Sequence, residues 1–260
     1  MSAQFSINSV IESCESTNDL AKEMGAWGPE RAPHGSWISA RIQSAGRGRL
    51  GRHWKSEAGN LFLSLIVRPV SSANLTWIPL VTAAAVAQTL YRLYPSISVR
   101  IKWPNDLWIL NGIGPAKVGG ILCESVSSKA GTFVVIGLGL NCVHAPENLD
   151  QATTCLANEI SGAKNQVTAP VTADDVRAPI AQAIADAVGR LDSEGPAALK
   201  REYEELAVFQ RGAEVFWVGA SGAKKSGRVV GLGGYGELKV VGENGVEIPL
   251  FSEDVSVRPA

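Results

Sequence analysis

A short segment rich in glycine and arginine holds the residue types best suited to chemistry on phosphates. Residues 46–52 read GRGRLGR and place Arg47, Arg49 and Arg52 among three glycines. Glycine lets backbone N–H groups approach phosphate oxygens, and arginine neutralises and grips those oxygens in bidentate fashion. A solvated basic loop is the alternative interpretation. Because three glycines give the empty loop high conformational entropy, we expect it to be disordered without ligand and ordered by ligand.

The same glycines also satisfy the G-x-G-x-x-G dinucleotide pattern, which has meaning only between a strand and a helix. Here the loop is followed by the polar turn KSEAGN and then by LFLSLIV, residues 61–67, which has the composition of a strand. The sequence therefore argues against a Rossmann-type nucleotide site.

Composition sets limits on the class of protein. The 260 residues are 45% hydrophobic with a net charge of −1, enough for a substantial core and unlike a general polyanion binder. Apolar runs are interrupted well short of the ~20 residues of a membrane span, so no membrane partner is expected. Four cysteines without C-x-x-C spacing, and no signal-peptide pattern, favour a cytoplasmic location. The three histidines are too scattered to predict a zinc site.

A polar cluster precedes the first expected helix. Residues 5–13 alternate apolar and polar types and predict a strand, and Ser16, Thr17 and Asn18 then lead into DLAKEMGAW. A hydroxyl of Ser16 or Thr17 as the helix N-cap is one interpretation. The other is that these hydroxyl and amide groups bond a small polar ring, such as a ureido group, inside a pocket.

The next elements place further polar residues at strand ends. Residues 36–42 predict a strand that delivers Gln43 and the arginine loop. A structural helix is expected between Pro79 and Pro95, because its apolar residues recur at helical spacing. Residues 99–110 predict two short strands joined by a Trp-Pro-Asn-Asp turn, where Lys102 can meet a phosphate and Asp106 can hold Mg²⁺.

Two glycine-containing strands complete the set. Lys117 begins an apolar strand with a glycine pair directly behind it, and the strand GTFVVIGLGLNC ends at Asn141. Glycines inside strands mark bulges or the close approach of a ligand or another backbone. Each motif is ambiguous alone, but all of them point to one ligand site.

In this order, ESTN (15–18), Gln43 with GRGRLGRHW, KWPNDLW, KVGGIL and VVIGLGLN resemble the motifs of biotin protein ligases. The resemblance implies an α+β fold: a catalytic domain with a mixed β-sheet and helices, class II synthetase-like, plus a small C-terminal SH3-like β-barrel. It also implies an enzyme that makes biotinyl-5′-adenylate from biotin and ATP with Mg²⁺. Biotin would then pass to one lysine of the biotin carboxyl carrier protein domain of acetyl-CoA carboxylase or a related carboxylase.

The resemblance also implies roles for individual residues. Lys117, Arg47 and Arg49 take the catalytic positions, and Asp106 is the candidate Mg²⁺ ligand. The expected biotin contacts are Ser16, Thr17, Asn18, Gln43, Gly46, Arg47, Gly48, Arg49, Lys117, Gly119 and Gly120. The expected nucleotide contacts are Arg49, Trp54, Lys102, Asn105 and Asn141. Leu50 departs from the pattern, since a basic or other polar residue is expected there.

The C-terminal part is predicted to contain helices followed by short strands. Helices are expected over residues 172–191, with Pro179 near the first turn, and over residues 196–207. From Ala213 onward, short strands and glycine turns predict the SH3-like barrel. We therefore predict a catalytic domain, 1–209, and a small domain, 210–260, which either stabilises the enzyme or helps to bind ATP or the carrier.

Two alternatives were weighed. A lipoate ligase shares the adenylation chemistry but is expected to lack the arginine loop beside KWPND and KVGGIL. A DNA-binding repressor is expected to carry an N-terminal helix-turn-helix, and only about ten residues precede the first site motif, so no DNA partner is predicted. A homodimer is compatible with the sequence, and no Ser-His-Asp or Cys-His arrangement indicates a covalent nucleophile.

Overall fold

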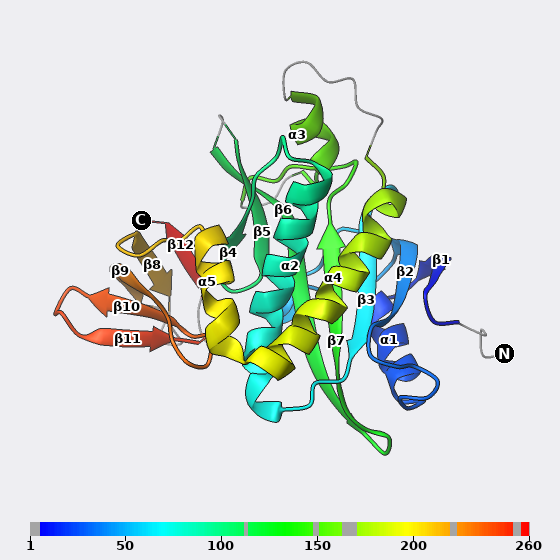
Figure 1. The fold of residues 1–260 in the computed structure, drawn as a ribbon. Helices are drawn as coiled ribbons and strands as arrows, with labels where there is room; N and C mark the ends of the chain where they lie inside the picture. Colours follow the sequence, from blue (N-terminus) through cyan, green and yellow to red (C-terminus); the bar gives the residue numbers. More distant parts are fainter. Residues whose placement is uncertain are drawn as a thin grey trace.

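The computed structural model describes residues 6–111, 114–147, 151–162, 171–218, 223–251 and 256–259. Figure 1 shows a large sheet covered by helices, with a smaller sheet beside it at the C-terminal end. The large sheet follows the order β1-β2-β3-β7-β6-β5-β4. Its strands are β1 (Ser9–Cys14), β2 (Ser36–Gln43), β3 (Leu61–Val67), β4 (Val99–Lys102), β5 (Asp106–Asn111), β6 (Gly114–Ser128) and β7 (Gly131–Leu140).

The sheet is mixed, as predicted, because β1 lies parallel to β2 whereas the other neighbouring strands are antiparallel. The predicted strand over residues 5–13 begins only at Ser9 in the described part of the chain, and Phe5 lies outside the described residues. Asn8 lies in a turn with φ 56°, a left-handed conformation that interrupts an extended chain. Alternation alone did not reveal this turn.

The helices are mostly where their patterns predicted them. They are α1 (Thr17–Gly25), α2 (Ile78–Leu93), α3 (Leu156–Gly162), α4 (Ala173–Glu194) and α5 (Pro196–Leu206), with short 3₁₀ turns at Arg49–Gly51 and Ser72–Trp77. Thr172 and Asp175 form a capping box that starts α4. Pro179 corrects a prediction: it lies inside α4, beyond the first turn, because the helix starts at Ala173.

The two faces of the large sheet carry different helices. Leu63 and Leu65 of β3 belong to the main core with α2 and α4, whereas Ile66 packs with Ala21 and Met24 of α1. Successive side chains of a strand point to opposite faces, so α1 covers the face opposite α2 and α4. In Figure 1, α2 and α4 lie side by side across the front of the sheet. Ser64 therefore points to the α1 face.

One helical stretch in the described part of the chain, Ser72–Leu93, has the length and composition of a membrane span. The sequence predicted a structural helix between Pro79 and Pro95, but the expectation that every apolar run falls well short of a span is corrected here. Of its most apolar window, 72% is buried inside the molecule. Packing against the sheet therefore accounts for its hydrophobicity.

The smaller sheet is antiparallel, in the order β11-β10-β9-β8-β12, and is consistent with the predicted SH3-like barrel. Its strands are β8 (Glu214–Val218), β9 (Lys224–Leu232), β10 (Leu238–Gly242), β11 (Glu247–Leu250) and β12 (Ser256–Pro259). Trp77 Nε1 donates to the Gly234 carbonyl at 2.8 Å, and Trp103 Nε1 donates to the Gly236 carbonyl at 3.1 Å. These bonds join the smaller sheet to the large one, and a domain boundary at residue 210 stays a prediction.

Candidate active site

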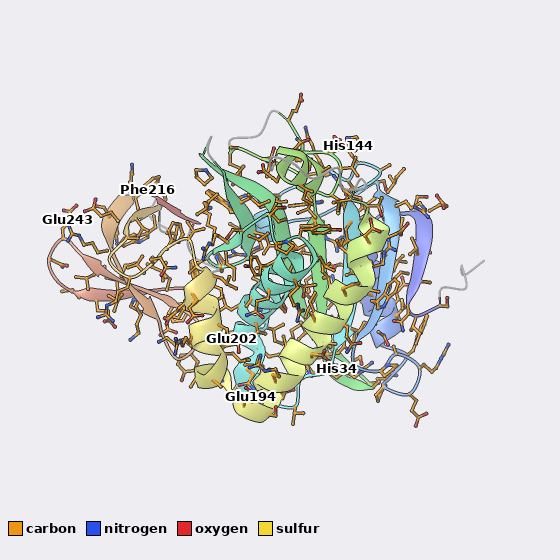
Figure 2. The ribbon with its side chains drawn as sticks, turned by 45° about the horizontal axis from the view of Figure 1, so that its top comes forward. His34, His144, Glu194, Glu202, Phe216 and Glu243 are labelled. Carbon is orange, nitrogen blue, oxygen red and sulfur yellow. The ribbon has the colours of Figure 1, made fainter. Side chains whose placement is uncertain are left out.

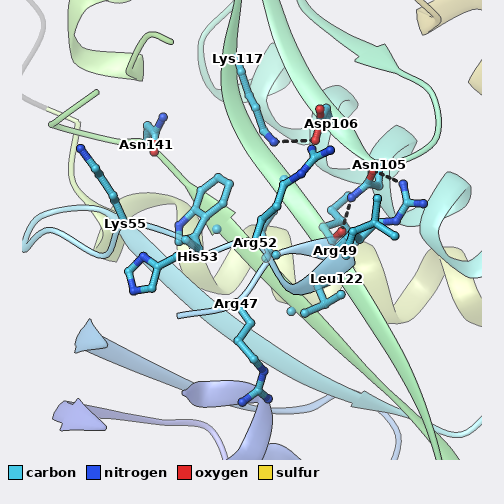
Figure 3. Close-up of a pocket in the computed structure, with 18 of the residues that line it drawn as sticks. Arg47, Arg49, Arg52, His53, Lys55, Asn105, Asp106, Lys117, Leu122 and Asn141 are labelled. Atoms are coloured by element: carbon cyan, nitrogen blue, oxygen red, sulfur yellow. Dashed lines mark hydrogen bonds and ion pairs between the residues drawn. The ribbon is translucent and has the colours of Figure 1, made fainter. Parts of the chain in front are cut away.

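A cavity of about 320 Å³ opens on the α1 face of the large sheet. Its wall combines the start of α1, the loop after β2, the β4–β5 turn and the facing strands β6 and β7, as Figure 3 shows in close-up. It gathers nearly all of the residues that the motifs predicted. Those are Ser16, Thr17, Asn18, Gln43, Arg47, Gly48, Arg49, Trp54, Lys102, Asn105, Asp106, Lys117, Gly120 and Asn141.

Two predicted ligand contacts, Gly46 and Gly119, do not line this cavity, and their contact with a ligand stays a prediction. Gly119 neighbours Gly120 in β6 and so points to the opposite face, where a Cβ would lie 2.9 Å from the Gly139 carbonyl oxygen. A Cβ on Gly46 would lie 2.7 Å from the Trp54 carbonyl oxygen. Both glycines therefore permit close packing behind the wall.

One end of the cavity is a buried network of neutral hydrogen-bonding groups. The backbone N–H and the hydroxyl of Thr17 both donate to Gln43 Oε1, at 2.8 and 3.0 Å. The Ser64 hydroxyl lies 2.8 Å from Thr17 Oγ1 and 2.6 Å from Asn18 Oδ1. Ser16 begins α1 without a side-chain cap, so the N-cap interpretation of these hydroxyls is wrong in this structure. The network instead ties α1 to β2 and β3.

The arginine loop lies over the cavity with its side chains in different directions. Arg47 donates to both carboxylate oxygens of Asp19 on α1, at 2.7 and 2.5 Å, and points away from Arg49 and Lys117 (Figure 3). This hydrogen bond lowers the pKa of Asp19, against the opposing effect of burial. Arg49 donates to Asn105 Oδ1 at 2.9 Å. Two arginines thus connect the loop to α1 and to the β4–β5 turn.

The loop takes one defined conformation in the structure, and its ordering by ligand stays a prediction. Leu50, the residue that departs from the family pattern, has φ 56° and is 64% exposed at the cavity rim. A left-handed leucine carries a conformational cost that glycine at the same position would not. We find no structural reason for leucine at this position.

A cationic centre lies at the junction of β5 and β6. Lys117 Nζ is 2.7 Å from Asp106 Oδ1, and Lys102 Nζ is 3.8 Å from Asp106 Oδ2. The Lys117 ammonium also lies 5.4 Å from the centre of the Trp54 ring, within the range of a cation–π contact. Asp106 and Trp54 together hold the lysine in place, and Figure 3 shows the ion pair between Lys117 and Asp106.

The Trp54 ring packs directly against glycine residues of β6 and β7. A Cβ on Gly139 would overlap the indole, and one on Gly120 would lie 3.2 Å from its Cζ3. A Cβ on Gly137 would likewise overlap the Asn18 amide. In this structure the side chains of Trp54 and Asn18 lie against the bare strand backbone, and the approach of a ligand there stays a prediction.

Asn141 lies at the end of β7, where its side chain donates to the Thr154 carbonyl at 3.0 Å and is 2% exposed. Its predicted contact with adenine is not tested by this geometry. Lys55, which also lines the cavity, donates to the Glu147 carbonyl at 2.8 Å.

Metal sites held by the protein alone and reactive thiols both depend on how particular side chains are grouped and buried. The described segments contain no group of three or more His, Cys, Asp or Glu side chains placed to hold a metal ion. Figure 2 shows His34 and His144 well apart. All four cysteines are free, and burial raises the pKa of Cys123 and Cys142 to about 12, which keeps both as thiols.

Several residues of the site were missed from the sequence, and three of them, Ser64, Asp19 and Glu124, bond to predicted site residues. Ser64 carried a signal, because it is the single polar residue in the fully buried strand β3. Asp19 and Glu124 look like ordinary solvated charges in the sequence. Only their spatial neighbours, Arg47 for Asp19 and Asn18 for Glu124, reveal their place in the site.

The Biotin/lipoate A/B protein ligase family model matches residues 10–141, half of the chain and the part that builds the cavity. The chain belongs to this family. The predicted resemblance to biotin protein ligases is thereby confirmed at the level of the family. The matched stretch begins in β1 and ends at Asn141, so it includes every candidate motif.

Individual relatives carry more specific names. A biotin--[acetyl-CoA-carboxylase] ligase of Paracoccus denitrificans is 42% identical over 118 residues, which is 43% of this chain and 46% of that protein. The bifunctional ligase/repressor BirA of Bacillus subtilis is 34% identical over 154 residues, 58% of this chain and 45% of BirA. The matches thus span less than half the length of these relatives.

A solved structure of similar shape is the biotin protein ligase from Aquifex aeolicus in complex with biotin and ATP. It superposes with a TM-score of 0.78 at 26% identity, and the match covers 97% of this chain and 98% of that one. The predicted α+β fold class is confirmed by this likeness together with the observed sheets.

Proposed function

We propose that this chain is a biotin protein ligase, which condenses biotin with ATP to biotinyl-5′-adenylate and transfers biotin to a lysine of a carboxylase carrier domain. One observation carries the proposal. A single cavity joins a buried cluster of neutral hydrogen-bonding groups, suited to a ureido ring, to a lysine and an arginine loop suited to phosphates. Family membership and the names of the relatives support the same activity.

In the first step, a carboxylate oxygen of biotin attacks the α-phosphorus of ATP. The bond from that phosphorus to the bridging oxygen of the β-phosphate breaks, and pyrophosphate leaves. Two anions must approach each other, so fixed positive charge lowers the barrier most. Lys117, oriented by Asp106 and Trp54, supplies such a charge at the cavity wall. The step needs no protein nucleophile.

In the second step, the neutral amine of the carrier lysine attacks the acyl carbon of the mixed anhydride. An amide forms, the acyl–oxygen bond breaks, AMP leaves with the electron pair, and the amine loses its proton. Water would give the same displacement, so the adenylate must be shielded until the carrier arrives. The loop over residues 46–52 lies at the cavity mouth and is the candidate lid.

Magnesium fits this site if the phosphates of ATP supply most of its ligands. Among the described residues of the cavity wall, the carboxylate is that of Asp106, and it is engaged by Lys117 and Lys102. Mg²⁺ keeps several waters and needs few protein ligands when phosphates supply the others. We propose that Asp106 takes part in holding Mg²⁺ with ATP, where the ion neutralises phosphate charge.

The carrier, assembly and location of the protein also remain proposals. The carrier is a biotin carboxyl carrier domain of acetyl-CoA carboxylase or a related carboxylase, as the name of the Paracoccus relative suggests. Homodimer formation, a cytoplasmic location and the absence of DNA and membrane partners stay predictions from the sequence.

The decisive experiment is mass spectrometry of the protein mixed with Mg²⁺ATP, a carrier domain and either biotin or lipoate. One biotin added to the carrier, with no lipoate adduct, is the expected result. A carrier variant with its target lysine replaced by arginine is the control. No biotin adduct on an active carrier, or a lipoate adduct instead, would contradict the proposal.

A further inference from the structure

Glu124 of β6 belongs to no motif of the site, but it lies beside the end of the cavity formed by Thr17, Asn18 and Ser64. We call this the ring end, because we assign the ring of biotin to it. Its Oε2 accepts a hydrogen bond from Asn18 Nδ2 at 2.7 Å, and its Oε1 accepts one from Lys22 Nζ at 2.6 Å. The carboxylate is thus held at both oxygens, by an amide of the cavity wall and by a cation of α1. Its side chain is 28% exposed, so it is neither a core residue nor a freely solvated charge.

The chemistry of a carboxylate fixes which way the Asn18 amide turns. An ionised carboxylate only accepts hydrogen bonds, so the NH₂ group of the amide must face Glu124. The amide oxygen then faces Ser64, whose hydroxyl donates to it across 2.6 Å. One amide hydrogen and one lone pair of Asn18 are used in this way, and one of each remains for a ligand in the cavity.

The surroundings make this orientation depend on Glu124. Asn18 is 5% exposed, and its oxygen lies against the bare backbone of Gly137, so the side chain has little room to move. Rotation by 180° would exchange oxygen and nitrogen without changing the shape of the amide. Ser64 does not prevent that exchange, because a hydroxyl both donates and accepts. Glu124 is therefore the group in this network that discriminates between the two orientations.

We propose that Glu124 is a positioning residue for ligand recognition, which fixes the Asn18 amide in the orientation that a bound ureido ring requires, and that Lys22 anchors it. This inference rests on the proposed function, because it assigns the ring of biotin to this end of the cavity. Glu124 acts through Asn18 and does not contact the ligand. Its loss should therefore change affinity for biotin and leave the chemical step intact.

The test is the biotin affinity of Glu124→Gln, measured by calorimetry, with Glu23→Gln as matched control. Glutamine keeps the shape of the side chain, but its own amide can donate to the Asn18 oxygen and so permits the rotated state. We expect Glu124→Gln to weaken biotin binding about tenfold, as for a hydrogen bond to a charged group. Glu23 is exposed on the same helix as Asn18, and its substitution should leave affinity unchanged.

A second measurement separates positioning from a general structural effect. If Glu124 acts only through Asn18, the Asn18→Ala, Glu124→Gln double variant should bind biotin no more weakly than Asn18→Ala alone. The KM for biotin should rise in Glu124→Gln, whereas the KM for ATP and kcat should stay within twofold of the parent. Lys22→Met, which removes the anchor, should shift affinity in the same direction by a smaller factor.

The outcomes distinguish the two proposals. A parent protein that binds no biotin would overturn the proposed function. A parent that binds biotin, with Glu124→Gln of equal affinity or with additive effects in the double variant, would overturn the role of Glu124 and leave the function standing. An equal loss in Glu23→Gln would assign the effect to net charge and would also overturn the positioning role.

Discussion

The two ends of the cavity differ in the kind of interaction that they offer a ligand. The ring end offers buried neutral hydrogen-bonding groups, whereas the end around Lys117, which we propose binds phosphates and call the phosphate end, offers charge. Thr17, Asn18 and Ser64 are at most 5% exposed, and their partners are mostly neutral groups at hydrogen-bond distance. At the other end, Lys117 pairs with the Asp106 carboxylate at 2.7 Å, and the two side chains remain 15% and 17% exposed. Buried hydrogen bonds discriminate between ligands in the ground state, whereas fixed charges matter most when charge moves during reaction. The two ends should therefore respond differently to substitution.

The largest expected effect is on the phosphate end. Lys117→Ala should slow adenylate formation by roughly a hundredfold, about 3 kcal/mol, because the charge is lost where the transition state forms. Biotin affinity should change little. Stopped-flow synthesis rates and calorimetry measure the two quantities, with Lys129→Ala, an exposed lysine on the β6–β7 turn, as the control. A normal rate of adenylate formation with weakened biotin binding would show that Lys117 acts in ground-state binding. The two ends of the cavity would then not differ in the way proposed.

The next largest effect is expected from Gly139, the strand glycine that packs against the Trp54 ring. Gly139→Ala introduces a Cβ that overlaps the Trp54 ring, so it should cost ~1–3 kcal/mol of stability and slow adenylate formation by displacing the ring from Lys117. Melting temperature and rate should fall together. Gly189→Ala is the control, since a Cβ there meets nothing within 4 Å and alanine favours a helix. An unchanged rate in Gly139→Ala would show that Trp54 does not orient Lys117.

A smaller effect is expected from the loop. Arg49→Gly removes the contact with Asn105 and adds backbone freedom, so the adenylate should escape sooner and acylate accessible amines. We expect a few-fold more biotin on serum albumin than with the parent protein, at matched rates of adenylate synthesis. Equal labelling by both proteins would show that the loop does not retain the intermediate.

The smallest effect concerns the ion pair that holds the loop to α1. The pKa of Asp19 is lowered from its ordinary 3.8, mainly by Arg47, so the pair contributes stability above that value and loses it as pH falls through the folded pKa. Both side chains are about 40% exposed, which limits the contribution to under ~1 kcal/mol. The carbon-13 shift of the Asp19 carboxyl should titrate below 3.8, and Arg47→Gln should return the midpoint toward it. A midpoint at or above 3.8 in the parent would mean that the pair does not form in solution.

The contrast between the two ends was only partly predictable from the sequence. The sequence indicated the phosphate end, because glycine and arginine in alternation have few uses other than binding anions. Part of the ring end was also indicated by Ser16, Thr17, Asn18 and Gln43. The hydroxyls of Ser16 and Thr17 had a second interpretation as helix caps, which spacing cannot decide because both roles use the same oxygen. The structure shows no side-chain cap and instead bonds Thr17 to Gln43 and Ser64, whereas contact with a ligand stays a proposal.

By itself, the sequence determined the elements of this protein. Hydrophobic periods of two and of about 3.6 residues follow from local backbone geometry, so they predicted the strands and helices. They also predicted the change from helices to short strands after residue 210. Tertiary structure alone decided which side chains meet. Asn18 and Glu124 are 106 residues apart and Arg49 and Asn105 are 56 residues apart, and no local rule joins them. Their contacts arise because the pairing of β6 with β7, and of β7 with β3, brings distant segments to one face of the sheet.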